Sequence, residues 1–121
     1  MEKAQSEEQK KVLARAVLNV ADQLDMSQSQ LATVIGVSRT SISRLKVKLR
    51  LDAHSKQGEL ALLLISIYKS LNILSGGEVK LMRLFMNSPN SVTGGIPIHQ
   101  INTISGLVHV SQQVSALRLR S

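Results

Sequence analysis

The sequence predicts an all-α fold, with an N-terminal helix-turn-helix domain followed by a small helical C-terminal domain. Three observations carry this prediction. Residues 27–47 hold helix-start signals on both sides of a glycine turn, apolar residues recur at helical spacing elsewhere, and no alternation typical of β-strands persists for long. A chain of 121 residues is one compact unit or two very small ones. We place the boundary between residues 1–56 and residues 57–121.

Residues 28–47 (QSQLATVIGVSRTSISRLKV) have the pattern of two short helices joined by a tight turn. Ala32 stands where the two helices would cross closely, so that only a small side chain fits. Gly36 follows four residues later, where a left-handed backbone costs glycine little. The residues expected to face inward are apolar: Leu31, Ile35, Val37, Ile42 and Leu45. An ordinary helical hairpin within a core is the alternative interpretation. The small residue, the turn glycine, the apolar residues and the cap residues all stand where a helix-turn-helix requires them, which favours the DNA-binding interpretation.

Both helices of this motif carry start signals, and the second has a polar outer face. Ser27 and Gln30 predict a capping box, and Ser38 predicts the N-cap of the second helix. Side chains that bind bases and phosphates would project from this region. We expect the DNA-binding residues to be Gln28, Ser38, Arg39, Thr40, Ser43, Arg44, Lys46 and Lys48.

The charge of the chain supports a nucleic-acid partner. The chain has 15 Lys and Arg against 8 Asp and Glu, which gives a net charge of +7. Residues 39–50 contain five basic side chains and no acidic one, as the neutralisation of phosphates requires. Duplex DNA is favoured over RNA, since one Tyr and one Phe provide little surface for stacking single-stranded bases.

The remaining helices are expected from apolar periodicity. Polar residues precede a first helix, which ends near Leu24, and residues 50–57 form a connector in which Leu51 could also extend the helix before it. The later helices are predicted at residues 58–74, 78–86, around 98–101 and 106–117. The apolar stripe of the first helix is expected to be Val12, Leu13, Ala16, Val17 and Val20.

Residues 58–74 (GELALLLISIYKSLNIL) are apolar on nearly every side. Lys69 and Asn72 interrupt the segment, which is short for a membrane span. A helix of this kind must be buried on several sides, so in a small protein it suggests a subunit interface as well as a core. We expect a homodimer with contacts at Leu63, Ile67 and Leu71; a central core helix without a second copy is the alternative.

An enzyme is not expected. The chain has no cysteine, which excludes disulfides, zinc fingers and thiol catalysis. His54, His99 and His109 lie apart in sequence without a helical pair for a metal, and no nucleophile–base grouping or phosphate-binding loop is visible. No metal site and no cofactor are predicted. Residues 1–11 are polar and charged, which argues against a secretory signal and favours the cytoplasm of a bacterium-like cell.

Several elements after residue 58 resemble the C-terminal domain of the Xre/MbcA/ParS antitoxin family. They are an apolar helix ending at Gly76-Gly77, a short amphipathic helix, a proline-containing loop, the run Gly94-Gly95-Ile96-Pro97, and a final helix with Gly106 and Val110. The similarity covers about residues 58–120, follows an Xre-type helix-turn-helix, and is most specific at the Gly-Gly-x-Pro loop. The chain differs from some members at Ser88-Pro89-Asn90 and in its basic Lys80 and Arg83.

The resemblance implies a non-enzymatic antitoxin that binds the operator of its own operon. Its C-terminal part would neutralise a toxin of RES or ParT type, which consumes NAD or transfers ADP-ribose. In the family the C-terminal end lies near the toxin's active site. We therefore expect Arg118, Leu119 and Arg120 to bind the toxin, because guanidinium groups pair with carboxylates and phosphates; a solvated tail is the alternative. A stand-alone prophage-type repressor dimer is the other candidate function.

Overall fold

The computed structural model describes residues 6–120, and within them the chain forms seven α-helices. In chain order they are α1 (Glu7–Gln23), α2 (Gln28–Ile35), α3 (Arg39–Lys48), α4 (Lys56–Leu74), α5 (Val79–Asn87), α6 (Pro97–Gln100) and α7 (Ile104–Arg120). The described residues contain no strand, only an isolated bridge between Asn90 and Gly95. The predicted all-α fold is confirmed.

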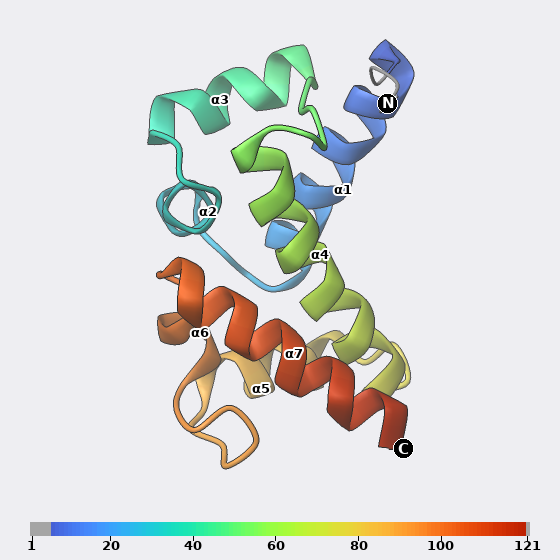
Figure 1. Cartoon of the computed structure of the whole chain (residues 1–121), viewed down its shortest axis with the longest axis vertical. Helices are drawn as coiled ribbons and strands as arrows, with labels where there is room; N and C mark the ends of the chain where they lie inside the picture. The colour runs from blue at the N-terminus through green and yellow to red at the C-terminus, as the bar shows by residue number, and fades with distance from the viewer. Residues whose placement is uncertain (1–5, 121) are drawn as a thin grey trace.

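The long helix α4 is the centre of this arrangement. It packs against α1 and α2 with its first half and against α7 and α5 further along (Figure 1). α3 lies at one end of the molecule in this view, and the end of α7 lies at the other. The buried apolar residues of all these helices form a single core. α4 starts two residues before the predicted Gly58, because the Ser55 hydroxyl accepts a hydrogen bond from the Gly58 amide at 3.0 Å.

The helix-turn-helix has the predicted local structure. The Ser27 hydroxyl accepts from the Gln30 amide at 3.1 Å, while the Gln30 side chain accepts from the Ser27 amide at 2.8 Å. The Ser38 hydroxyl caps α3 by accepting from the Ser41 amide at 3.1 Å. Gly36 is left-handed, with φ of 74°, and turns the chain between the two helices. The capping box, the N-cap and the glycine turn predicted from the sequence are therefore confirmed.

Three local predictions are corrected. Val12 is exposed, since the buried stripe of α1 runs through Leu13, Val17 and Val20 instead. Leu51 does not extend α3: Leu49 ends that helix with a left-handed backbone, and the Leu51 amide donates to the Lys10 carbonyl of α1 at 3.2 Å. The last helix is longer than residues 106–117 at both ends.

None of the helices in the described range has the length and apolar character needed to cross a lipid bilayer.

Gly106, in the first turn of α7, allows a close approach that any larger residue would prevent. A Cβ atom at this position would collide with the carbonyl oxygen of Gln100, which is backbone and cannot rotate away. We expect Gly106→Ala to lower the free energy of unfolding by about 1–3 kcal/mol, as overpacking does elsewhere. Urea denaturation followed by circular dichroism measures this change. Ser105→Ala, at an exposed neighbouring position, is the control; an equal effect of both variants would contradict the steric argument.

Candidate functional site

The second helix of the motif, α3, has one buried face and one exposed face. Ile42 and Leu45 are buried against α1 and α2 and fix the rotation of the helix about its axis. On a helix of 3.6 residues per turn, the opposite direction is taken by Thr40, Ser43 and Arg44, and all three are exposed. In a helix-turn-helix this outward face of the second helix enters the major groove of DNA. α3 therefore presents the side chains that were predicted to reach base edges.

The other predicted residues lie on the two flanks of α3. Gln28, at the start of α2, and Lys46 line the same surface hollow, so residues distant in sequence are brought together. On the other flank, Lys48 and Arg44 line a second hollow. Arg39 is exposed at the start of the helix. Ser38 is exposed as well, and its hydroxyl oxygen accepts the N-cap hydrogen bond of α3 from the Ser41 amide.

Two further residues of this surface were not among the named DNA-binding residues, although Arg50 belongs to the basic run 39–50. Val47 is 83% exposed although it is apolar, and it lies on the outward side of α3 beside Ser43. An exposed methyl-bearing side chain at such a position can contact the C5-methyl group of thymine. Arg50, just after α3, shares a hollow with Arg44 and Lys48. The position of Val47 followed from the sequence, since it is four residues after Ser43 and therefore on the same face of the helix.

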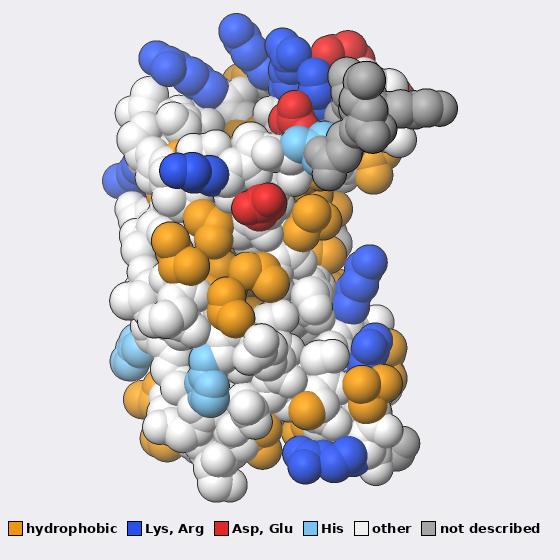
Figure 2. All heavy atoms as spheres, in the orientation of Figure 1, with side chains coloured by type: hydrophobic (Ala, Val, Ile, Leu, Met, Phe, Trp, Pro, Cys, Tyr) orange, Lys and Arg blue, Asp and Glu red, His pale blue; other side chains and the backbone are white. Residues whose placement is uncertain are grey.

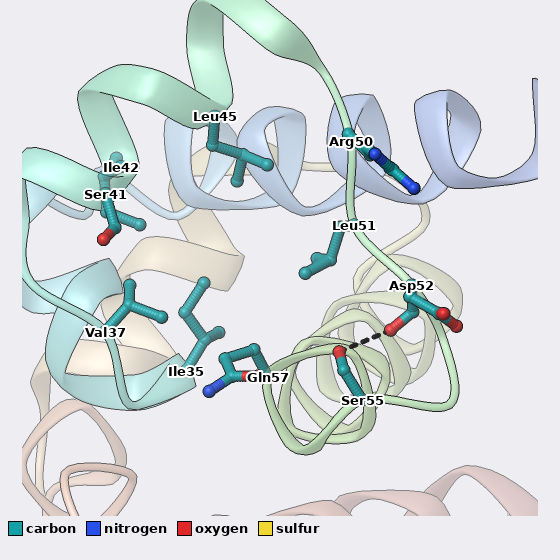
Figure 3. A pocket seen from close by; sticks show the side chains of 10 residues that line it. All are labelled: Ile35, Val37, Ser41, Ile42, Leu45, Arg50, Leu51, Asp52, Ser55 and Gln57. Atoms are coloured by element: carbon teal, nitrogen blue, oxygen red, sulfur yellow. Dashed lines mark hydrogen bonds between the residues drawn. The ribbon is translucent and has the colours of Figure 1, made fainter. Parts of the chain in front are cut away.

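A cleft of about 320 Å³ lies beneath α3, between the turn of the motif and the start of α4 (Figure 3). Its lining is half aliphatic and half polar, and Ile35, Leu45 and Leu51 point into it from α2, α3 and the connector. At its edge the Ser55 hydroxyl donates to the Asp52 carbonyl at 2.6 Å, which holds the connector in place. The buried Ile42 and Leu45 hold α3 against α1 and α2, and its polar face is left to the solvent.

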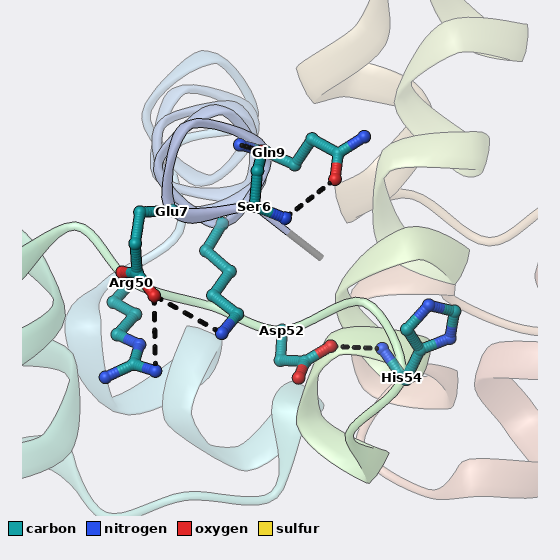
Figure 4. A network of polar contacts seen from close by, with 7 residues as sticks. Ser6, Glu7, Gln9, Arg50, Asp52 and His54 are labelled. Atoms are coloured by element: carbon teal, nitrogen blue, oxygen red, sulfur yellow. Dashed lines mark hydrogen bonds and ion pairs between the residues drawn. The ribbon is translucent and has the colours of Figure 1, made fainter. Parts of the chain in front are cut away.

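One acidic side chain reaches into the basic region around α3. The Glu7 Oε1 atom lies 3.4 Å from the Arg50 Nη2 atom and 3.4 Å from the Lys10 Nζ atom (Figure 4). Glu7 and Lys10 both belong to the start of α1, so the pair with Arg50 is the one that links this helix to the segment after α3. Both pairs are partly solvated, and exposed pairs of this kind contribute little to stability. They do reduce the positive charge that α3 and its surroundings present.

Basic side chains gather along the edge of the molecule where α3 lies (Figure 2). α3 itself has no acidic residue. This arrangement suits a polyanion, because each Lys or Arg that pairs with a phosphate releases condensed counterions from the DNA.

The side chains predicted for a dimer contact are placed differently from expectation. Ile67 and Leu71 are 0% and 3% exposed, because α7 and the other helices around α4 cover them within the chain itself. Leu63 is partly buried and packs against the same core. The prediction that Ile67 and Leu71 face a second copy is therefore corrected: they belong to the chain's own core.

The C-terminal residues predicted to bind a toxin are helical. α7 continues through Arg120, so Arg118, Leu119 and Arg120 extend the helix and do not form an irregular tail. Leu119 and Arg120 are exposed, and Arg118 is half-buried. Among the described residues, no three His, Cys, Asp or Glu side chains come together as metal ligands.

Two protein-family models together match nearly the whole chain. The model for the antitoxin Xre-like helix-turn-helix domain matches residues 4–66. The model for the antitoxin Xre/MbcA/ParS C-terminal toxin-binding domain matches residues 70–119. The chain belongs to the Xre/MbcA/ParS antitoxins. It is thus an antitoxin with a DNA-binding module and a toxin-binding module, and these families are regulatory domains, not enzymes. No curated protein matches the sequence.

The two family matches meet inside α4, between residues 66 and 70. The antitoxin therefore does not separate its two modules with a linker. One continuous helix contributes its first half to the DNA-binding module and its second half to the toxin-binding module.

Arg44→Ala and Arg39→Ala should weaken binding of the antitoxin to its operator. A side chain that contacts a base contributes about 1–3 kcal/mol of discrimination. If the bound protein contacts about 6–10 phosphates, affinity should also fall about 10³- to 10⁵-fold between 50 and 200 mM salt. Fluorescence anisotropy with operator duplex measures both effects. Arg120→Ala removes the same charge at the opposite end of the molecule and serves as the control; an Arg39/Arg44 double variant with unchanged affinity would refute the interface.

Glu7→Gln should strengthen binding to DNA of any sequence. The substitution frees Arg50 and Lys10 from their acidic partner, and we expect a gain of about two- to fivefold at low salt, in line with the strength of exposed ion pairs. The measurement is a titration of non-operator duplex at 50 and 200 mM salt. Glu8→Gln changes the net charge equally at an exposed neighbouring position without an ion pair of its own among those described. Equal gains from both variants would show that net charge alone matters.

Proposed function

We propose that the chain is the antitoxin of a type II toxin–antitoxin module and represses its own operon by binding operator DNA through α3. The observation that carries this proposal is the exposed row of Thr40, Ser43 and Arg44 on α3, flanked by basic side chains, in a chain that belongs to an antitoxin family. Repression follows if the bound protein occupies the promoter. Operator binding and a partner made from the same operon would both occur in the cytoplasm.

The proposed partner is a toxin of RES or ParT type, which consumes NAD or transfers ADP-ribose from it. The support is the similarity of residues 70–119 to the toxin-binding domain of the family. The basic end of α7 adds a chemical argument: Arg118 and Arg120 can pair with carboxylates or phosphates at the toxin surface. In this proposal the antitoxin is not an enzyme and acts by covering the toxin.

A homodimer is also part of the proposal. Helix-turn-helix proteins commonly bind two half-sites about 34 Å apart, which requires two copies related by a two-fold axis. Since Ile67 and Leu71 are internal, a second copy would have to use other side chains. The large apolar residues that α4 leaves exposed are Leu62 and Ile73.

A stand-alone repressor is the alternative. In that case residues 57–121 would have no toxin to bind, and the gene would have no toxin-sized neighbour. The match of residues 70–119 to a toxin-binding domain favours the antitoxin.

Removal of residues 118–121 should release toxin activity and leave DNA binding intact. The cut follows Leu117, so the side chain that lines a hollow together with residues of α4 and α5 is retained, and α3 lies at the other end of the molecule. Growth rescue of cells that express the toxin encoded beside the antitoxin gene, together with operator binding in vitro, measures the two outcomes. A truncated protein that rescues as well as the full chain would show that neutralisation runs through the helical surface without these residues.

A further inference from the structure

Helix α5 is apolar on two sides, but only one of them is covered. Met82 and Met86 are buried against the core. Leu81 and Leu84, three residues apart and therefore neighbours on the helix surface, are 53% and 61% exposed. Single exposed leucines are common, whereas adjacent exposed leucines on one short helix are typical of a surface that another molecule covers.

A hollow of about 180 Å³ opens beside Leu81. It lies where the end of α4, the middle of α5 and the end of α7 meet, and its lining is almost entirely apolar: Leu71, Leu74, Ser75, Leu81, Met82, Phe85 and Leu117. A cavity of about 150 Å³ with a similar lining accepts a benzene ring in another protein. The hollow therefore has the volume for one leucine- or phenylalanine-sized side chain.

The charged residues in this part of the chain are mostly basic. Within residues 70–120 the only acidic side chain is Glu78. Arg83 is already engaged, since its guanidinium donates to the carbonyl oxygens of Gln23 at 2.8 Å and Asp22 at 3.2 Å. Lys80 and the arginines at the end of α7 form no ion pair among those described. In Figure 2, basic and hydrophobic side chains lie side by side at the end of the molecule where α7 finishes.

We propose that the toxin docks on the surface formed by Leu81, Leu84, Phe85 and Leu117, inserting one large apolar side chain into the hollow and pairing acidic residues with Arg118 and Arg120. This inference rests on the proposed function and adds an anchor that the C-terminal arginines alone do not provide. A second copy of the antitoxin would bring like charges together at this surface, which disfavours a self-contact there. The surface also lies within residues 70–119, which match the toxin-binding domain.

The tether at Arg83 gives this surface a fixed position. The carbonyls that it binds belong to the last turn of α1, where the helix dipole favours a cation. α5 also contacts α4 and α6. These contacts fix α5, and with it the position of the two exposed leucines. The antitoxin would therefore lose little conformational freedom when the toxin binds.

The test uses Leu81→Glu and Leu84→Glu in the full-length antitoxin, with Ile104→Glu as the matched control. Ile104 is 67% exposed and lies at the start of α7, away from the hollow, where an acidic residue suits a helix N-terminus. The probe is the protein encoded by the adjacent reading frame, purified and titrated by calorimetry. Each α5 variant should bind it at least about tenfold more weakly, since buried interface anchors commonly contribute more than 1.4 kcal/mol, while Ile104→Glu should bind as the wild type does.

Thermal unfolding, operator binding and light scattering separate the outcomes. Variants that keep the wild-type melting temperature and operator affinity but lose the toxin support the docking surface. Folded variants that bind the toxin like the wild type overturn this surface and leave the proposed function standing. If the wild type itself binds nothing, the proposed function and the surface fail together. If the α5 variants lose toxin binding and light scattering shows that the free antitoxin has also changed its oligomeric state, the surface is a self-association contact and the proposal is wrong.

Discussion

The burial of α4 on several sides is the constraint on which the rest of the structure depends. Its side chains Leu64 and Ile67 are fully buried, and each contributes about 1.5–3 kcal/mol relative to exposure. α1 and α2 cover one part of the helix, and α7 covers another. Neither module has a complete core without it. The antitoxin therefore folds as one unit around α4, although the two family matches divide the chain into two domains that meet within this helix.

The loop that contains the run Gly94-Gly95-Ile96-Pro97 is held in place by its own hydrogen bonds. Thr93 lies buried inside this loop, and its backbone carbonyl accepts a hydrogen bond from the Gln100 side-chain Nε2 at 2.7 Å. The His109 Nε2 atom lies 2.8 Å from the same oxygen. The bridge between Asn90 and Gly95 closes the loop. These contacts fasten the loop to α6 and α7. The run Gly94-Gly95-Ile96-Pro97 thus belongs to the scaffold that positions α7.

The sequence predicted well where short-range chemistry decides the structure. The cap at Ser27, the turn at Gly36 and the cap at Ser38 each depend on a few neighbouring residues, so their types and spacing were sufficient. The outward face of α3 followed from the same spacing.

Prediction was weaker where the result depends on which helix covers which face. Val12 fits an apolar stripe by spacing, yet no helix covers it. Ile67 and Leu71 were assigned to a dimer contact because the helix that carries them is apolar on nearly all sides. A protein of this size was expected to cover only part of that apolar surface. α7 provides that cover, and its full length could not be derived from periodicity alone. The exposed pair on α5 escaped notice for the same reason, since its spacing does not distinguish an inner face from an outer one.

The two proposed binding surfaces lie at opposite ends of the antitoxin, and this separation has a mechanistic consequence. α3 occupies one end and the C-terminus of α7 the other (Figure 1). DNA and toxin bound at these ends would share no side chain, so the antitoxin could hold both at once. Both ends are basic, which suits DNA at one and an acidic rim at the other. Any influence of toxin on operator binding would then have to pass through α4 or the Arg83 tether, or arise from the way toxin arranges several antitoxin copies on the operator.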